Sequence, residues 1–198
     1  MRGLGRYLNP AFAAFALVLA LGFAAVAEQL ETPAPKVETQ ADVLDRLFVE
    51  LADPDNENWQ YAEENIWIQW SKSGSPAMDL LLQRGRQSMA AGDFAAAIEH
   101  LTALIDHDPD FAEGWNARAT AYFNAGLFGP SIEDVRHVLL LNPRHFGAMA
   151  GLGMMLEDMD KPKDALTAYE AARAIHPRQP GVLDAVERLH RQLDGQDI

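Results

Sequence analysis

The sequence predicts an all-α protein, an α-solenoid made of stacked antiparallel helical hairpins. Proline recurs at Pro109, Pro143 and Pro177, with a constant period of 34 residues. The apolar and small residues between these prolines recur in the same register. A fixed period of this length is typical of stacked helical hairpins, because a single hairpin cannot bury its apolar face alone.

The first 27 residues have the order of a secretory signal peptide. Arg2 and Arg6 precede an uninterrupted apolar run over residues 11–27, which ends in the small residues Ala25 and Ala27 on either side of a valine. Such a basic start, apolar segment and small-residue end is typical of an exported chain. The run is slightly shorter than the roughly 20 residues that span a bilayer. We therefore expect a periplasmic protein cleaved after Ala27; retention as an inner-membrane anchor facing the periplasm is the alternative.

The acidic charge argues against nucleic acid and anionic lipid as partners. The chain has 16 basic and 29 acidic residues, and residues 1–27 hold two of the arginines and no acid, so the remainder has 14 and 29 and a formal charge of −15. Such a surface repels phosphate groups. The chain has no cysteine, which excludes disulfides, thiolate metal sites and cysteine nucleophiles.

Residues 28–38 are rich in proline and glutamate and are predicted to form a disordered linker. Residues 39–75 then carry two amphipathic patterns, the second over residues 57–72, which predict a helical pair or degenerate first repeat. The second helix has Trp59, Trp67 and Trp70 on one stripe. We expect these tryptophans to pack on the helix over residues 78–91 and to cap the solenoid. An exposed aromatic patch for a partner is the alternative.

Three repeat units follow, over residues 76–109, 110–143 and 144–177. The first helix of each unit shares one register of large and small residues, and the second helix shares another: Leu81, Gly85 and Ser88 with Ala97 and Leu101; Trp115, Ala119 and Tyr122 with Ser131 and Val135; Met149, Gly153 and Leu156 with Ala165 and Tyr169. Small residues allow paired helices to approach closely, and large residues fill the grooves between them.

The prolines predict where the helices end. Proline lacks an amide donor and disfavours helix in the preceding residue, so helices should end at Asp108, Asn142 and His176. After Pro109, Asp110 and Glu113 have the spacing of a capping box. The corner between neighbouring hairpins therefore lies at each proline. Beyond the third corner, residues 178–198 hold one amphipathic helix from Pro180 to Leu193 that would cover the last apolar face, and a short tail.

The repeated pattern resembles the tetratricopeptide repeat (TPR) family, in which Trp-x2-Leu-Gly-x2-Tyr is followed by Ala-x3-Phe and then Pro. The best matching unit runs from Trp115 to Pro143, and the match covers residues 78–177. The resemblance implies a right-handed superhelix of about three TPR units, with the N-terminal helical pair and a C-terminal capping helix. Arg84 and Arg118 stand where the family usually has leucine, and Ser131 stands where it has alanine. We expect these replacements to loosen the second unit slightly.

The resemblance also implies that the first helix of each unit lines a concave groove for a peptide or helix. Positions on one face of these helices give the predicted groove stripe: Asp79, Leu82, Arg86, Met89, Glu113, Asn116, Thr120, Phe123, Gly147, Ala150, Met154 and Glu157. This mixture suits a segment that is apolar with some positive charge. Some family members bind a chaperone's terminal carboxylate, but of the matching positions here (Leu82, Arg86, Ala117, Gly147 and Gly151) only Arg86 suits an anion. That activity is not transferred to this chain.

No catalytic, cofactor or metal site is predicted. The alternating acids Asp106, Asp108 and Asp110 lack the glycine and the final glutamate of a calcium loop. His100 and His107 share a helix face, but the sequence does not indicate the third ligand that a metal site there would need. Gly147 and Gly151 form a GxxxG pattern that does not follow a strand, so close helix packing explains it better than phosphate binding.

These observations predict an exported TPR scaffold or adaptor that binds a protein or peptide in its concave groove, without catalysis. The alternative is a structural, non-catalytic subunit of an envelope assembly, which would bind through the Trp-rich N-terminal helices or the convex face.

Overall fold

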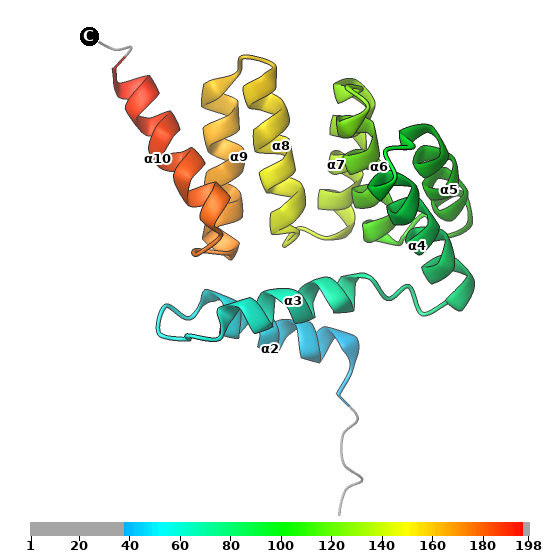
Figure 1. The fold of residues 1–198 in the computed structure, drawn as a ribbon. Coiled ribbons are helices and arrows are strands. Elements are labelled where there is room, and N and C mark those ends of the chain that lie inside the picture. Colours follow the sequence, from blue (N-terminus) through cyan, green and yellow to red (C-terminus); the bar gives the residue numbers. More distant parts are fainter. Residues whose placement is uncertain (1–37, 196–198) are drawn as a thin grey trace, which may run out of the picture. The chain divides into compact units, whose positions relative to one another are not determined.

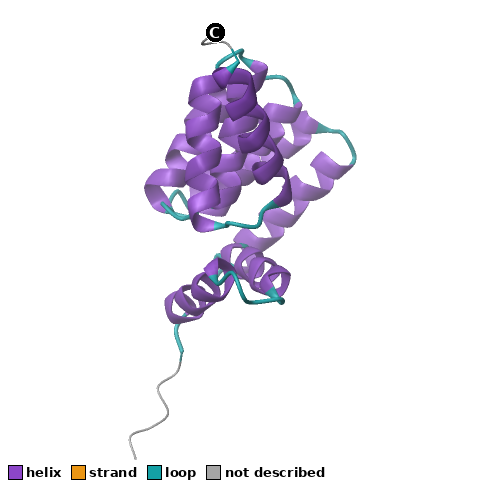
Figure 2. Cartoon of the chain, turned by 90° about the vertical axis from the view of Figure 1, so that its left-hand side faces the viewer, coloured by secondary structure: helices purple, strands orange, loops and turns teal. Residues whose placement is uncertain are grey.

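The computed structural model describes residues 38–195, and in this range every regular element is an α-helix. The helices are α2 (Gln40–Ala52), α3 (Trp59–Trp70), α4 (Pro76–Ala90), α5 (Phe94–His107), α6 (Ala112–Asn124), α7 (Phe128–Leu141), α8 (Phe146–Asp158), α9 (Pro162–Ile175) and α10 (Pro180–Asp194) (Figures 1 and 2). All of them lie in one unit that begins at Gln40. The predicted signal segment and almost all of the predicted linker, residues 28–38, lie outside the described residues.

Consecutive helices pair as α4–α5, α6–α7 and α8–α9, and α10 packs on α9 (Figure 1). The turn inside each hairpin has a residue in the left-handed conformation at the same place in the repeat. Gly92 has a φ of 76° and Gly126 has a φ of 75°, whereas Asp160 takes the third place with a φ of 56°. Glycine adopts this conformation without steric cost, whereas a residue with a Cβ does not. The third turn is therefore slightly strained where the first two are not.

The corners between hairpins lie at the predicted prolines. Helices α5, α7 and α9 are followed by the C-cap residues Asp108, Asn142 and His176, as the sequence predicted. The predicted capping box after Pro109 is wrong, because α6 begins one residue later than it requires. The N-cap of α6 is Phe111 and has no side-chain cap bond, and the Glu113 carboxylate instead binds side chains of α4 and of the residue before α8.

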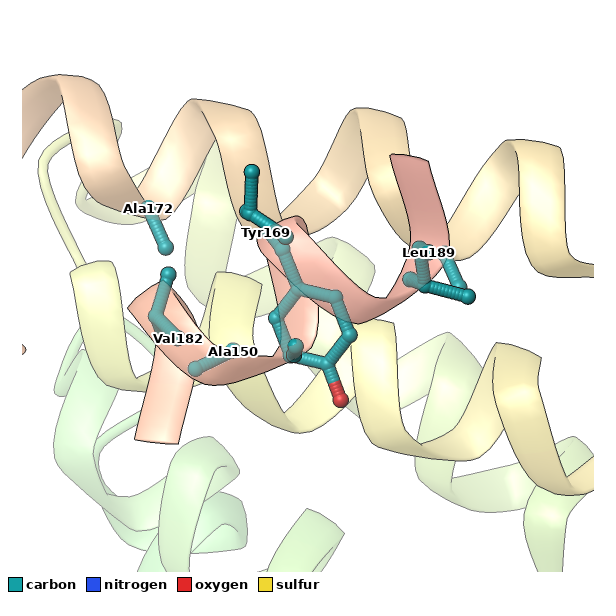
Figure 3. Packing of buried hydrophobic residues seen from close by; sticks show 8 residues of the cluster. Ala150, Tyr169, Ala172, Val182 and Leu189 are labelled. Carbon is teal, nitrogen blue, oxygen red and sulfur yellow. The ribbon is translucent and has the colours of Figure 1, made fainter. Parts of the chain in front are cut away.

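Small residues let the two helices of a hairpin approach. A Cβ added at Gly85 would lie 2.5 Å from Leu101 Cγ, and one added at Gly153 would lie 2.7 Å from Tyr169 Cε1. Figure 3 shows how the Tyr169 ring lies between Ala150 of α8 and Leu189 of α10. The buried face of α10, with Val182, Val186 and Leu189, therefore covers the apolar surface that the third hairpin leaves.

Polar contacts accommodate the unusual residues of the second unit. Arg118 donates from Nε and Nη2 to the two carboxylate oxygens of Asp134, at 2.8 and 2.9 Å, and its guanidinium lies 5.1 Å from the centroid of the Trp115 ring. Ser131 is fully buried and donates from Oγ to the carbonyl oxygen of Ala119 at 2.7 Å. The polar groups of Arg118 and Ser131, which replace apolar residues of the family pattern, are thus hydrogen-bonded within the protein.

The N-terminal pair α2–α3 does not pack on α4 as predicted. It crosses the ends of later repeats, below α8 and α9 in Figure 1. Trp67 and Trp70 contact Phe146 at the start of α8, and Trp59 contacts His176 after α9. Among the described residues, the apolar cluster formed by Trp70 and Phe146, against which Trp59 and Trp67 pack, contains no residue of α4. The prediction that the tryptophans cap the solenoid at α4 is therefore wrong: the corner residues supply the aromatic surface on which they pack.

Arg178 connects the corner after α9 to the loop between α2 and α3. Its Nη1 donates to the carbonyl oxygen of Asn56 at 2.8 Å, and its Nη2 donates to that of Asp53 at 2.7 Å. The same guanidinium lies 5.5 Å from the Trp59 ring centroid. Residues far apart in sequence are thus tied by directional bonds as well as by apolar packing.

Candidate partner-binding groove

A cavity of about 440 Å³ lies between α6 and α8, with residues of α7 also at its wall. Predicted groove residues from both helices line it: Asn116, Thr120, Phe123, Gly147, Ala150 and Met154. Trp67 of α3 lines it as well, and this residue was not part of the predicted groove stripe. A cavity of this size is within the range of ligand-binding pockets.

The cavity is apolar with uncharged polar groups at its wall. Phe123, Met154 and Met155 supply apolar surface, and no charged side chain of the described residues lines it. Asn116 Nδ2 donates to Glu113 Oε2 at 3.1 Å, and Asn124 Nδ2 donates to the carbonyl oxygen of Thr120 at 2.9 Å. Each bond uses one of the two N–H donors of its amide, so both side chains can still offer a donor and an acceptor.

The two glycines of the GxxxG pattern have different neighbours. A Cβ added at Gly147 would lie 2.8 Å from Trp67 Cζ2, so glycine is needed for the indole ring to lie against the start of α8. A Cβ added at Gly151 would have no atom within 4 Å, and this residue lines the cavity. The explanation of the pattern by close helix packing therefore holds at Gly147, where Trp67 of α3 packs against α8, and is wrong at Gly151, which leaves space.

Not all residues of the predicted stripe are available to a partner. Leu82 and Glu113 are only 2% and 3% exposed, so their assignment to an open groove is corrected. Leu82 packs in the core of the first hairpin, against which Met89 also packs. Asp79 accepts hydrogen bonds from the backbone N–H and the hydroxyl of Ser73, at 2.9 and 2.7 Å, and so fixes the connection before α4. Helix periodicity identified the face but not how neighbouring elements cover parts of it.

Glu157 also has a partner. Arg188 Nη2 donates to both of its carboxylate oxygens, at 2.8 and 2.9 Å, and this bond connects α8 to α10. Its charge is therefore compensated on the side where α10 covers the last hairpin.

Arg86 is held in a polar cluster that connects α4, α6 and α8. Its Nη2 donates to Glu113 Oε1 at 2.5 Å and to Ser71 Oγ at 3.1 Å. The other Glu113 oxygen lies 3.2 Å from Nε2 of the buried His145. His145 Nδ1 accepts a hydrogen bond from the backbone N–H of Ala148 at 3.0 Å, so Nε2 carries the proton of the neutral ring and donates to Glu113. Because Glu113 compensates its charge, Arg86 is poorly suited to hold a partner's carboxylate.

Two histidines, His145 and His176, lie where the N-terminal pair meets the repeats; the sequence analysis named His176 only as a helix end and did not single out His145. The His145 ring stacks on Trp70 with centroids 4.2 Å apart and an interplanar angle of 16°. His176 is fully buried, neither ring nitrogen has a hydrogen-bond partner among the described residues, and its Nε2 lies 3.5 Å from Glu63 Oε1. Burial lowers the pKa of His176, and the nearby Glu63 carboxylate partly opposes this effect. In the sequence, their positions within two residues of the corner prolines Pro143 and Pro177 could have indicated this location.

Residues 38–195 contain no group of three histidine or acidic side chains arranged to hold a metal ion, so neither the Asp106–Asp110 acids nor His100 and His107 form one. Within the same residues, no helix combines the length and the apolar character needed to cross a bilayer.

No protein-family model matches the chain. A TPR repeat-containing protein of Rhizobium etli is 36% identical over 155 residues, which cover 77% of this chain and 75% of that protein. The chain belongs to the TPR repeat family. A heat-shock cognate co-chaperone of Aspergillus fumigatus is 30% identical to this TPR protein over 122 residues, but these cover only 35% of the co-chaperone.

Solved TPR structures share the fold. The first TPR domain of Spaghetti (RPAP3), bound to the HSP90 peptide SRMEEVD, superposes with a TM-score of 0.58 at 22% identity and covers 61% of this chain and 95% of that domain. MamA has a TM-score of 0.57 at 20% identity and covers 73% of this chain and 87% of its own. At these identities the likeness concerns the fold alone, and with the helices described above it confirms the α-solenoid.

Proposed function

We propose that this TPR protein is a non-catalytic adaptor that binds a segment of a partner protein in the cavity between α6 and α8. The observation that carries the proposal is the cavity itself. It combines apolar walls with uncharged amide groups, and several residues of the predicted groove stripe line it. Such a surface can bury apolar side chains while it hydrogen-bonds a main chain.

The RPAP3 domain supports a peptide as the class of ligand, because that domain is bound to an HSP90 peptide. That peptide contains two glutamates and a terminal aspartate. In this chain, Glu113 compensates Arg86, and no cationic side chain of the described residues lines the cavity. We therefore do not expect an acidic, carboxylate-terminated peptide to be the ligand here.

We further propose that the protein acts after export, in the periplasm, because residues 1–27 have the order of a signal peptide. Fractionation of the producing cells and N-terminal sequencing of the isolated protein test this. A protein that begins at Glu28 in the periplasmic fraction supports cleavage, an intact membrane-bound chain supports the anchored alternative, and a cytosolic protein would contradict export.

Two matched threonines give a test of the groove. Thr120 on α6 and Thr167 on α9 are both exposed, and each donates its hydroxyl to the carbonyl oxygen four residues earlier, at 3.0 and 3.1 Å. Thr120 lines the cavity, whereas Thr167 does not. Thr120→Arg should reduce partner capture from an extract of the producing cells by at least about tenfold, or roughly 1.4 kcal/mol. Thr167→Arg should leave capture unchanged. Equal capture by both variants would show that the groove is not the binding surface.

The alternative, an assembly subunit that binds through α3, keeps one supporting observation. Tyr61 and Ile68 on α3 are 63% and 45% exposed, although Trp70 is buried and Trp59 and Trp67 are partly buried. A Tyr61→Ser and Ile68→Ser double variant that loses its partner while Thr120→Arg keeps it would favour this function over groove binding.

A further inference from the structure

Trp67 belongs to two neighbouring cavities. One is the cavity between α6 and α8, which has no charged lining. The other lies between α3 and α4, and its charged lining residues are Glu63, Glu64, Lys72 and Arg86. The Trp67 side chain thus lies between the uncharged cavity and the charged cavity and lines both.

The second cavity has an excess of negative charge. Arg86 is paired with the buried Glu113, so Lys72 is the cation left in this lining opposite Glu63 and Glu64. Glu63 Oε1 also lies 3.5 Å from Nε2 of His176. The Lys72 ammonium lies 3.3 Å from Gln69 Oε1, and the chain as a whole has a formal charge of −13. The carboxylates of this cavity attract a basic side chain of a ligand and repel an acidic one.

The polar groups of the first cavity include hydrogen-bond acceptors. Asn116 and Asn124 each use one amide N–H in a bond within the protein, and each side chain also carries an oxygen that can accept a hydrogen bond. Gln179 also lines the cavity, and its Oε1 is buried with no hydrogen-bond partner among the described residues. A buried acceptor without a donor is unfavourable, so a ligand that brings N–H groups complements this wall.

We infer that the two cavities form one site for a peptide segment that combines a large apolar residue with a neighbouring lysine or arginine. The apolar side chain enters the cavity between α6 and α8, main-chain N–H groups of the segment face the amide oxygens, and the basic side chain lies beside Glu63 and Glu64. Trp67 separates the two subsites, so the N-terminal pair contributes directly to the groove of the repeats. This inference rests on the proposed function and names its class of ligand.

Two glycines provide a test that preserves the core. A Cβ added at Gly151 or at Gly129 would meet no atom within 4 Å, and both residues lie in helices. Gly151 lines the cavity and Gly129 does not. Gly151→Leu therefore fills the apolar subsite, whereas Gly129→Leu adds the same side chain elsewhere.

The probe is a phage-displayed library of random decapeptides, selected on residues 28–198 of the wild-type protein and measured as synthetic peptides by calorimetry. We expect the selected peptides to pair Leu, Met or Phe with a nearby Lys or Arg. Gly151→Leu should weaken their binding by at least about tenfold, or roughly 1.4 kcal/mol, and Gly129→Leu should leave it within about twofold. Replacing the basic residue by glutamate should also weaken binding. Selection of acidic peptides, or of none, would overturn the inference.

Fluorine NMR separates the inference from the proposed function. In protein labelled with 5-fluorotryptophan, the Trp67 signal is the one absent from Trp67→Phe, and it should shift when a selected peptide binds. If Gly151→Leu and Thr120→Arg abolish binding while the Trp67 signal never moves, the composite site is wrong and groove binding stands. If peptides bind and neither variant affects them, the groove function itself is wrong.

Discussion

Gly147→Ala and Gly151→Ala should change stability in opposite directions, although the residues are one helical turn apart. At Gly147 the new Cβ would lie 2.8 Å from Trp67 Cζ2. The indole cannot retreat easily, because its ring packs against His145 and Phe146 with centroids 5.5 Å from each. Overpacking of this kind costs about 1–3 kcal/mol. The gain in helix propensity, up to about 1 kcal/mol, is smaller near the start of a helix.

At Gly151 the Cβ meets no atom within 4 Å. The variant should therefore keep most of the propensity gain of about 1 kcal/mol. We expect Gly147→Ala to be destabilised by roughly 1–2 kcal/mol and Gly151→Ala to be stabilised by up to about 1 kcal/mol, a difference of about 2–3 kcal/mol.

Urea denaturation followed by circular dichroism measures both changes, as a shift in the midpoint at constant m-value. Tryptophan emission of Gly147→Ala should also shift to the red as Trp67 is displaced from its contacts. Equal stabilisation by the two alanines would refute the reasoning, since it would mean that Trp67 does not lie against the start of α8 in solution.

Three further predictions follow from single contacts. Burial lowers the pKa of His176 below its ordinary value of 6.5, so as the pH falls the unfolded chain takes up this proton before the folded protein does. The contribution of His176 to the free energy of unfolding should therefore be complete above pH 6.5 and decrease below it. Urea titrations at several pH values should find this decrease reduced in His176→Leu. Asp134→Ala leaves Arg118 without its carboxylate at a site where its side chain is 13% exposed, which should cost about 3–5 kcal/mol in calorimetry, whereas replacing both by leucine should restore most of the loss. Asp160→Gly should raise the melting temperature slightly, by relieving up to about 1 kcal/mol of left-handed strain, and a decrease would contradict the strain.

The repeat architecture could be predicted because its signals are local. Each proline acts on its own residue and on the one before it, so the helix ends at Asp108, Asn142 and His176 followed from the sequence. Periodicity likewise assigned Asn116 and Met154 to the predicted groove stripe, and both line the cavity between α6 and α8.

Other features depend on residues distant in sequence and could not be predicted. The spacing of Asp110 and Glu113 fits a capping box, yet the Glu113 carboxylate binds Arg86 and His145 instead. Nothing near Trp67 in the sequence indicates that its partner is Phe146 rather than a residue of α4. A stripe of tryptophans predicts burial, but the surface that buries them is determined by the tertiary fold.

The crossing of α2–α3 below α8 and α9 changes how the array can come apart. In a linear solenoid each repeat touches only its neighbours, so the terminal repeat can unfold while the rest remains native. Here the loop before α3 holds Arg178 beyond the third repeat, and α3 holds Phe146 at its start. Fraying of the third repeat would break these contacts with α3 and with the loop before it, so we expect its unfolding to be coupled to that of the α2–α3 pair.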